Sequence, residues 1–400
     1  PMRRETLMMA VSAQSLPQAD VAPPSLGNRR VRLLYFITAD WYFCSHRLPL
    51  AIAARDNGYD VGVITRVRDH GALIREAGLR LIPFEMSRRG RNPFQELAHV
   101  AALTQIYRHE QPDIVHHVAM KPVIYGTIAA RRAGVPHVVN ALAGLGYAFT
   151  SSDLRARIMR PVIRHALARL LCESSVIIQN DTDRDFVADI GVPADRTHVV
   201  RGSGVDLNWF RPQPEPPGTP LAILPARLLR DKGILEFVGA ARLLKARGVT
   251  ARFALVGDPD PENPASVAES EIARWREEGI VELWGKRDDM PEVFAQCHLV
   301  CLPSYREGLP KVLLEAAASG RAIVTTNVPG CRDVVKDGAN GLLVEARDVH
   351  GLAAAIATLI RDRALREKMG TRGRKMAEKS FSVARIVQET LAVYPQSSRP

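Results

Sequence analysis

S-Y-R-E-G-L-P-K-V-L-L-E, residues 304–315, is the stretch that decides the fold of this 400-residue chain. A short apolar run at residues 298–303 precedes it and predicts a buried strand, and the apolar spacing of residues 312–318 predicts a helix. A loop that leads from the carboxyl end of a parallel strand into a helix is a common ligand site in α/β sheets. The free N–H groups at the start of the helix favour a phosphate there.

Two carboxylates in this stretch, Glu307 and Glu315, are not expected to bind a phosphate, because like charges would repel it. The hydroxyl groups of a nucleotide sugar are better partners for a carboxylate, which only accepts hydrogen bonds. An equally simple alternative is that Glu307 is solvated and that Glu315 caps the helix. The spacing alone leaves both alternatives open.

The run Y-R-E-G-L-P-K-V-L-L-E-A-A-A-S-G-R-A-I-V-T-T-N-V-P-G-C-R-D-V-V, residues 305–335, resembles the donor-site signature of family 4 glycosyltransferases. The two glutamates of that signature fall on Glu307 and Glu315, and the resemblance extends from about residue 30 to about residue 381. It implies an α/β protein of the GT-B fold, in which two Rossmann-like parallel-sheet domains face each other across a cleft. It also implies a retaining enzyme of the subgroup that acts on polyprenyl-diphosphate-linked sugars.

The length of the chain predicts two domains, and its composition predicts where they divide. Residues 1–28 are predicted to be a disordered tail, and residues 29–210 a Rossmann-like acceptor domain. The proline-rich residues 211–220 predict a linker, and residues 221–380 a Rossmann-like domain for the nucleotide-sugar donor. By resemblance, a terminal helix at residues 381–394 returns to the first domain.

The first domain opens with a predicted strand, loop, helix and strand, which is the start of a Rossmann-type unit. The strands are predicted at residues 31–38 and 59–65, with a loop at residues 39–47 and a helix at residues 48–57. The sequence contains no G-x-G-x-x-G motif at this point, so a dinucleotide is not expected.

The chain is basic, with a formal net charge of +11, and its five cysteines form no paired framework. Scattered cysteines indicate a reducing compartment. A basic surface favours nucleic acid, an anionic membrane or a phosphorylated ligand, although a compositional bias toward arginine is an alternative. No nucleic-acid-binding module is recognisable, so nucleic acid is not an expected partner. No apolar run is long enough for a transmembrane helix or a signal peptide, which predicts a cytoplasmic protein.

Residues 225–233, P-A-R-L-L-R-D-K-G, predict a strand end, a loop and a helix start. Arg227 and Lys232 can converge on one anion from such a loop, whereas Arg230 is expected to face the solvent. Each charged hydrogen bond to a phosphate is worth roughly 1.5–3 kcal/mol. The resemblance implies that Arg227 and Lys232 hold the donor diphosphate and stabilise the leaving group, so they are predicted to be catalytic together with Glu307. The alternative is a solvated basic loop.

The resemblance also implies the other donor contacts. Glu307 would bind hydroxyls of the transferred sugar, Glu315 would bind those of the ribose, and the loop at residues 284–290 would lie against the base. Lys311 departs from the family, where smaller polar residues are common, and is expected either to contact a phosphate or to be exposed. The predicted donor-binding residues are Arg227, Lys232, Gly285, Arg287, Glu307, Gly308, Leu309, Pro310, Lys311 and Glu315.

The first domain is expected to bind the acceptor. Aromatic and polar residues gather at residues 39–47 and resemble the acceptor wall of enzymes that glycosylate polyprenyl-diphosphate-linked sugars; the alternative is a loop anchored by its aromatic side chains. Alternation along a predicted strand points one of His116 and His117 inward, although a strand histidine is more often structural. The predicted acceptor-binding residues are Asp40, Trp41, His46, Arg47, His117 and Lys121.

One departure from the family concerns a histidine that contacts the reacting sugar in many of its members. The corresponding position is Ala143, within A-L-A-G-L-G-Y at residues 141–147, so a catalytic histidine is not expected there. The family's front-face mechanism lets the leaving diphosphate take the proton of the acceptor and therefore needs no protein base.

Residues 153–171 are basic and amphipathic, with Pro161 expected to kink the helix that they predict. Such a segment can lie on an anionic membrane, which is worth about 1 kcal/mol per cation near the surface. The alternative is a helix that packs on the core with a solvated face.

Two D-x-D motifs, at residues 181–183 and 258–260, match the pattern of metal-using glycosyltransferases. The first predicts a capped helix start and the second a proline-rich surface loop, so neither a metal nor another cofactor is expected.

These observations predict a retaining glycosyltransferase that moves a hexose or N-acetylhexosamine from a nucleotide sugar to a polyprenyl-diphosphate-linked saccharide. Resemblance to the subgroup, and no particular residue, implies UDP as the nucleotide, and the expected product is a surface polysaccharide such as lipopolysaccharide. The enzyme would be cytoplasmic and peripheral at the inner face of the plasma membrane. Two alternatives are a nucleotide-sugar epimerase of the same fold and a basic protein that binds membranes or nucleic acid without catalysis.

Overall fold

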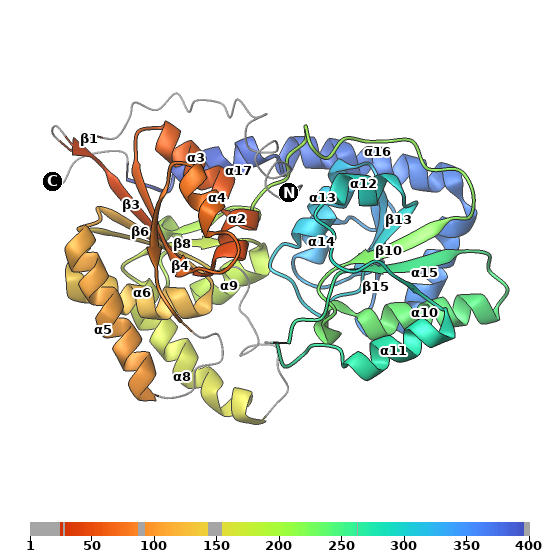
Figure 1. Cartoon of the computed structure of the whole chain (residues 1–400), viewed down its shortest axis with the longest axis horizontal. Coiled ribbons are helices and arrows are strands. Elements are labelled where there is room, and N and C mark those ends of the chain that lie inside the picture. The colour runs from red at the N-terminus through yellow and green to blue at the C-terminus, as the bar shows by residue number, and fades with distance from the viewer. Residues whose placement is uncertain (1–24, 27–28, 87–92, 143–153, 262, 396–400) are drawn as a thin grey trace. The chain divides into compact units, whose positions relative to one another are not determined.

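The computed structural model describes residues 25–26, 29–86, 93–142, 154–261 and 263–395, which form two α/β units (Figure 1). The amino-terminal unit contains the described residues up to Ser203 together with the end of the chain from Ala384. The carboxy-terminal unit contains Gly204–Val383. Each unit has one sheet of parallel strands with helices between them, which is the expected Rossmann-like organisation.

The amino-terminal unit is built on a seven-stranded sheet with the order β5-β4-β3-β6-β7-β8-β9. The order reverses between β3 and β6, so the carboxyl ends of these two strands form a topological switch point, where ligands bind in such sheets. The strands are β3 (Arg32–Ala39), β4 (Asp60–Arg66), β5 (Arg80–Pro83), β6 (Ile114–Val118), β7 (His137–Ala141), β8 (Ser175–Ile178) and β9 (Thr197–Val199).

The helices of this unit connect the strands and, in α17, bring the end of the chain back to it. They are α2 (Asp40–His46), α3 (Leu48–Asp56), α4 (Gly71–Glu76), α5 (Pro93–Glu110), α6 (Met120–Ala133), α8 (Leu154–Leu171), α9 (Asp181–Asp189) and α17 (Val383–Leu391), with a 3₁₀ turn at Ala194–Arg196. Just after α17, the Tyr394 hydroxyl lies 2.9 Å from the Tyr35 hydroxyl and 2.7 Å from His116 Nδ1. The end of the chain is therefore bonded into the core of the amino-terminal unit.

Two predicted segments of this unit differ in the structure. Residues 39–47 are not a loop, because α2 occupies Asp40–His46. The helix buries Phe43 and Cys44, and this tertiary packing stabilises a helix that is too short to form alone. The prediction of a disordered tail at residues 1–28 extends too far along the chain, because β1 (Ser25–Leu26) pairs antiparallel with β2 (Arg29–Arg30).

The carboxy-terminal unit is built on a six-stranded parallel sheet with the order β12-β11-β10-β13-β14-β15. Its switch point lies between β10 and β13. The strands are β10 (Leu221–Pro225), β11 (Arg252–Val256), β12 (Glu282–Leu283), β13 (Leu299–Leu302), β14 (Ala322–Thr326) and β15 (Gly341–Val344). The helices are η2 (Arg230–Lys232), α10 (Ile234–Ala246), α11 (Glu269–Glu278), α12 (Met290–Ala295), α13 (Lys311–Ala318), α14 (Cys331–Val334), α15 (Val349–Arg361) and α16 (Arg363–Ser380).

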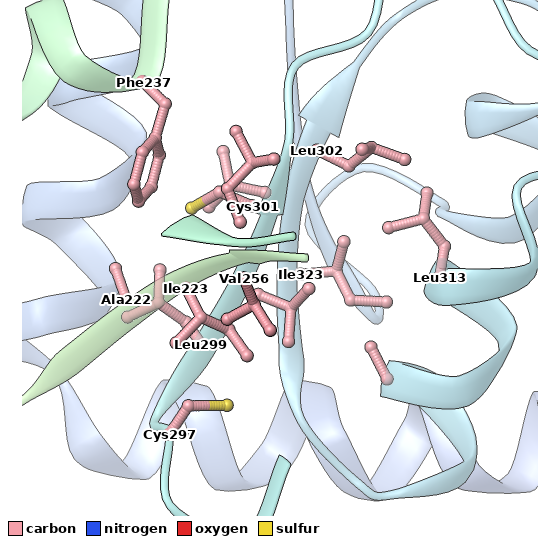
Figure 2. Close-up of a cluster of buried hydrophobic side chains, with 14 of the residues drawn as sticks. Ala222, Ile223, Phe237, Val256, Cys297, Leu299, Cys301, Leu302, Leu313 and Ile323 are labelled. Carbon is pink, nitrogen blue, oxygen red and sulfur yellow. The ribbon is translucent and has the colours of Figure 1, made fainter. Parts of the chain in front are cut away.

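The core of this unit lies between the sheet and its helices (Figure 2). Ile223 on β10 and Leu299 on β13 are fully buried and belong to the same hydrophobic cluster as Phe237 of α10 and Leu313 of α13. The central strands are apolar along their whole length because helices cover both faces of the sheet. The packed core holds the loops at the carboxyl ends of β10 and β13 in place.

The predicted linker at residues 211–220 packs on the carboxy-terminal unit. Glu215 is ion-paired with Arg366 of α16 at 2.7 Å, and both side chains are less than a tenth exposed. Arg321 Nη1 donates to the Gln213 carbonyl at 3.0 Å, and His298 Nε2 lies 3.0 Å from the Pro216 carbonyl oxygen. The segment is thus part of this unit, whose chain begins at Gly204.

Candidate active site

The loops that follow β10 and β13 meet at the switch point of the carboxy-terminal unit. Gly233 has φ +74°, and a Cβ added there would lie 2.2 Å from the Pro303 carbonyl oxygen. Only glycine permits this backbone conformation and this close approach at low cost. The Tyr305 N–H also donates to the Asp231 carbonyl at 2.9 Å. The two predicted donor loops are therefore bonded to each other.

Lys232 and Glu307, which the sequence places 75 positions apart, form an ion pair at this point. Lys232 Nζ lies 2.5 Å from Glu307 Oε1, and the same oxygen accepts a hydrogen bond from Ser304 Oγ at 2.7 Å. The side chain of Glu307 is only 11% exposed, so the alternative of a solvated glutamate is wrong.

Arg227 reaches the neighbouring loop, where its Nη1 lies 2.6 Å from Asp260 Oδ2. Gly257 allows this approach, because a Cβ at that position would lie 2.0 Å from the Ala226 carbonyl oxygen. Arg230 points elsewhere, since it pairs with Glu271 at 2.6 Å and remains 48% exposed. Asp260, which the sequence analysis placed in a surface loop, is thus the ion-pair partner of a predicted donor residue.

Helix α13 begins after Pro310, and Glu315 lies in its second turn. Glu315 is 8% exposed and does not cap the helix, so the simple alternative for this residue is also wrong. Burial raises the pKa of Glu315, and the nearby Lys311 ammonium, with Nζ 3.5 Å from Glu315 Oε1, opposes that shift. Lys311 is therefore a neighbour of the predicted ribose ligand, with its side chain 27% exposed.

The backbone around Gly308 is enclosed by the start of α14. A Cβ added to Gly330, which has φ +80°, would lie 2.4 Å from the Gly308 carbonyl oxygen. Leu309 is buried at 8% exposure, and Pro310 is also buried. The structure thus places Gly308, Leu309 and Pro310 in one turn between Glu307 and α13.

The predicted base loop is held to the loop after β11. The Lys286 N–H donates to Asp258 Oδ1 at 3.1 Å, and Gly285 has φ +65° at this turn. Arg287 Nε donates to Asp289 Oδ1 at 2.6 Å, and the guanidinium carbon lies 6.0 Å from the centre of the Trp284 ring.

Each cation of the predicted donor site faces a carboxylate in this structure. The pairs are Arg227–Asp260, Lys232–Glu307, Arg287–Asp289 and Lys311–Glu315. A diphosphate that binds here must therefore compete with these carboxylates for its cations.

Glu236 and Tyr305 are further residues at this edge that the sequence analysis missed. The Tyr305 hydroxyl donates to Glu236 Oε1 at 2.7 Å, and the Arg347 guanidinium lies 4.6 Å from the centre of the Tyr305 ring. Glu236 is 8% exposed, and its Oε2 has no hydrogen-bond partner among the described residues. A carboxylate in the first turn of α10, three residues after Gly233, is the sequence signal that could have indicated it.

Asp40 and His117, which were predicted to bind the acceptor, lie in the interior of the amino-terminal unit. Asp40 is 1% exposed, and its Oδ2 accepts the N–H groups of Arg68 at 2.6 Å and His70 at 2.9 Å. His117 is fully buried between Asn140 Oδ1 at 2.8 Å and the Tyr107 hydroxyl at 3.0 Å, and burial lowers its pKa to about 4. Their hydrogen-bonding groups are used inside the fold, so both are structural residues.

The remaining predicted acceptor residues lie at the carboxyl edge of the first sheet. Trp41 and His46 are partly exposed, and the His46 ring stacks on Tyr42 with 4.2 Å between ring centres. Lys121 Nζ lies 3.0 Å from Glu96 Oε1, and its side chain is 21% exposed. Arg47 is almost fully buried, at 5% exposure.

Several further predictions concern segments that the structure describes in part. Ala143 and the turn at residues 144–147 lie outside the described residues. Within α8, which contains Pro161, Leu167 and Leu171 are fully buried, so the second half of this basic segment packs on the core. Asn180 Oδ1 accepts the Asp183 N–H at 2.8 Å, which is the expected helix cap.

Metal-binding and membrane-spanning features were also sought among the described residues. No group of three or more His, Cys, Asp and Glu side chains in them is arranged to hold a metal ion. No helix in the same part of the chain combines the length and the apolar composition that a bilayer crossing requires.

The two Rossmann-like units are those of the GT-B fold. The crystal structure of HepE from Anabaena, in complex with UDP and glucose, superposes with a TM-score of 0.72. It is 21% identical to this chain, and the superposition covers 91% of this chain and 98% of the other.

The family follows from the sequence matches. Residues 32–180 match the family described as "Glycosyl transferase 4-like", and residues 206–376 match "Glycosyl transferases group 1". The chain therefore belongs to the glycosyltransferases that combine these two domains, and it is an enzyme of that class.

Two relatives have names that specify their reactions. The N,N'-diacetylbacillosaminyl-diphospho-undecaprenol alpha-1,3-N-acetylgalactosaminyltransferase of Campylobacter jejuni is 29% identical over 80% of this chain and 87% of its own length. The UDP-Gal:alpha-D-GlcNAc-diphosphoundecaprenol alpha-1,3-galactosyltransferase of Escherichia coli is 25% identical over 75% of this chain and 79% of its own length.

Proposed function

We propose that this protein is a retaining, metal-independent glycosyltransferase that transfers a hexose or N-acetylhexosamine from a UDP-sugar to a saccharide carried on a polyprenyl diphosphate. The observation that carries the proposal is the Lys232–Glu307 pair, which lies at the switch point between β10 and β13. The names of the two relatives support the acceptor class, and the UDP in the HepE complex supports the nucleotide. The product would contribute to a surface polysaccharide.

In the proposed donor site, the cations bind the diphosphate and the carboxylates bind the hydroxyl groups. Arg227 and Lys232 bind the donor diphosphate, and their charges stabilise the leaving group as the glycosidic bond breaks. Glu307, released from Lys232, accepts hydrogen bonds from the hydroxyls of the transferred sugar, and Glu315 accepts those of the ribose. The acceptor hydroxyl attacks from the side of the leaving diphosphate, which takes its proton.

We also propose that the enzyme works as a peripheral protein at the cytoplasmic face of the membrane that holds its acceptor. Helix α5 of the amino-terminal unit supports this location, because Phe94 is 82% exposed and Leu97 is 61% exposed on its first turns. Large apolar side chains that remain in water at such a position favour contact with a lipid surface.

A thermal-shift panel of nucleotides tests the donor site, with EDTA and with Mg²⁺ as parallel conditions. Because UDP at 100 times its Kd adds about 2.7 kcal/mol of stability, we expect a clear shift with UDP in both conditions. Lys232→Ala should reduce the shift, and Arg230→Ala, a control on an outward-facing arginine of the same loop, should not. An equal shift in all three proteins, or none with any nucleotide, contradicts the proposed site.

A transfer assay distinguishes the alternatives. A UDP-sugar and a polyprenyl-diphosphate-linked sugar should give an α-linked product, whose anomeric configuration NMR can determine. Conversion of the UDP-sugar into another UDP-sugar without acceptor would instead identify an epimerase. Salt-dependent binding to lipid or nucleic acid with no nucleotide preference would identify a non-enzymatic basic protein.

A further inference from the structure

Arg47, at the start of α3, is a buried cation without a partner in the described part of the chain. It is 5% exposed, its Nε is buried without a hydrogen bond, and no described carboxylate forms an ion pair with it. A buried charge is costly unless an opposite charge or several hydrogen bonds compensate it. The other well-buried arginines of the protein illustrate the rule, since Arg366 pairs with Glu215 and Arg321 donates to four carbonyl groups.

Two more buried polar atoms without partners lie on the same face of the sheet. His116 and Thr65 are at most 1% exposed, and His116 Nε2 and Thr65 Oγ1 make no hydrogen bond to any described residue. Tyr35 on β3 is in register with Val63 on one side and His116 on the other, and Thr65 follows two residues after Val63, so their side chains share one face. Burial and then the charge of Arg47 lower the pKa of His116, which indicates that the guanidinium lies nearby.

This group lies at the switch point of the amino-terminal sheet. Arg47 follows β3 in the chain, just before α3, and α6 starts immediately after β6 (Figure 1). Both segments therefore leave the two strands between which the strand order reverses. The residue before α6, Ala119, has φ +77° and ψ 161°, a conformation that is strained for any residue except glycine. Strain of this kind accumulates where a ligand site requires it. The N–H groups at the start of α3, a nine-residue helix, add partial positive charge.

We propose that Arg47, with the start of α3 and the unpaired ring nitrogen of His116, forms a phosphate-binding site in the amino-terminal unit that holds the diphosphate of the lipid-linked acceptor. The ligand is an anion because it must compensate the unpaired guanidinium. It is a phosphate because a guanidinium binds two phosphate oxygens at once, and N–H groups at a helix start bind the same group.

The acceptor is the expected source of this phosphate, an assignment that rests on the proposed function. The donor diphosphate has its own cations, Arg227 and Lys232, in the other unit. An acceptor with a single sugar before its diphosphate carries that diphosphate close to the reacting hydroxyl. A site for it in the acceptor-binding unit would orient the sugar and would select lipid-linked saccharides over free ones.

Calorimetric titration of the full-length protein with inorganic pyrophosphate tests the site, with saturating UDP present to fill the donor site. A parallel titration of Lys232→Ala removes donor-site binding without the need for UDP. We expect Arg47→Gln and Arg47→Met to weaken pyrophosphate binding by roughly 10- to 100-fold, the loss of one charged hydrogen-bonded contact. Arg75→Gln, which removes an exposed arginine of α4 in the same unit, is the matched control and should bind like the wild type.

Melting temperatures distinguish a binding residue from a structural one. Without pyrophosphate, Arg47→Met should melt no lower than the wild type, because it removes an uncompensated buried charge. With saturating UDP present to fill the donor site, pyrophosphate should raise the melting temperature of the wild type but not that of Arg47→Met. A large drop in the melting temperature of Arg47→Met, or pyrophosphate binding that does not depend on Arg47, overturns the proposal.

Two further outcomes separate this inference from the proposed function. If UDP displaces the Arg47-dependent pyrophosphate, the site serves the nucleotide and the assignment to the acceptor is overturned. If UDP does not bind at all, the donor site fails, while the titration of Lys232→Ala still decides the phosphate site. In the active enzyme, Arg47→Gln should raise the KM for the diphosphate-linked acceptor about tenfold and leave the KM for the UDP-sugar unchanged.

Discussion

At the scale of single residues, ion pairs join the side chains of the candidate donor site. A bound donor diphosphate would replace the carboxylates as the partner of the cations. Lys232 is ion-paired with Glu307, and Arg227 with Asp260. In the absence of a donor, each carboxylate therefore neutralises a cation that is predicted to bind the donor diphosphate. This arrangement lowers the cost of keeping like charges close together. It also makes the carboxylates competitors of the donor diphosphate.

Replacing Asp260 with asparagine tests this competition. The Arg227–Asp260 pair is partly exposed, so its removal should release about 0.2–1 kcal/mol and tighten UDP binding by up to about fivefold in calorimetric titration. Glu271→Gln is the matched control, because it frees the outward-facing Arg230 from a pair of the same length and should leave UDP affinity unchanged. Weaker UDP binding in Asp260→Asn would mean that Asp260 positions Arg227 for the donor instead.

Site residues that lie close together in the sequence could be predicted, whereas residues whose partners are far away along the chain could not. Glu307 and Glu315 share one short motif, and its resemblance to a family signature is what singled them out in the sequence. Asp260 was not recognisable, because it lies 33 residues from Arg227 and only the parallel pairing of β10 with β11 brings their loops together. The prediction for His117 failed for a related reason, since only the packing of α5 and the pairing of β6 with β7 supply the hydrogen bonds that make it a core residue.

At the scale of elements, α5 combines a buried side with an exposed apolar one. Leu103 and Tyr107 are fully buried in the core, whereas Phe94 and Leu97 extend into solvent. The sequence of α5 does not by itself separate the apolar side chains that pack on the core from those that stay exposed, because both kinds are apolar.

Charge substitutions on α5 test its role at the membrane. The double variant Phe94→Glu and Leu97→Glu should lose most of its co-flotation with liposomes of anionic phospholipid, because apolar contact is removed and negative charge is added. Its melting temperature should stay unchanged, since both side chains are exposed. Gln95→Glu, an exposed position between them, controls for the added charge alone. Equal flotation of the double variant and the wild type would exclude α5 as the contact.

At the scale of the whole molecule, the connection to the carboxy-terminal unit is a packed segment. Glu215 and Arg366 form a buried ion pair, and the carbonyl groups of Gln213, Pro214 and Pro216 accept hydrogen bonds from Arg321 and His298. The cleft expected between the two units remains a prediction.

Removing one partner of the buried pair should destabilise the carboxy-terminal unit. Glu215→Ala leaves Arg366 buried without a counter-charge, which costs about 3–5 kcal/mol, so calorimetry should show a lower melting temperature for this variant. Glu367→Ala is the control, because it breaks only the exposed Arg363–Glu367 pair and should leave the melting temperature nearly unchanged. Similar melting of both variants would show that the segment does not stabilise the unit.

The sequence by itself determined the fold class, because apolar periodicity and short motifs are local signals, and it predicted the donor residues through the resemblance of residues 305–335 to a family signature. Only the tertiary structure decided that residues 40–46 form a helix, that residues 211–220 pack on a domain, and that Asp40 and His117 belong to the interior. Only the fold also revealed that Arg47 is buried without a partner among the residues that the structure describes. The physical reason is that burial and charge pairing depend on contacts between residues far apart in the chain, which no local pattern specifies.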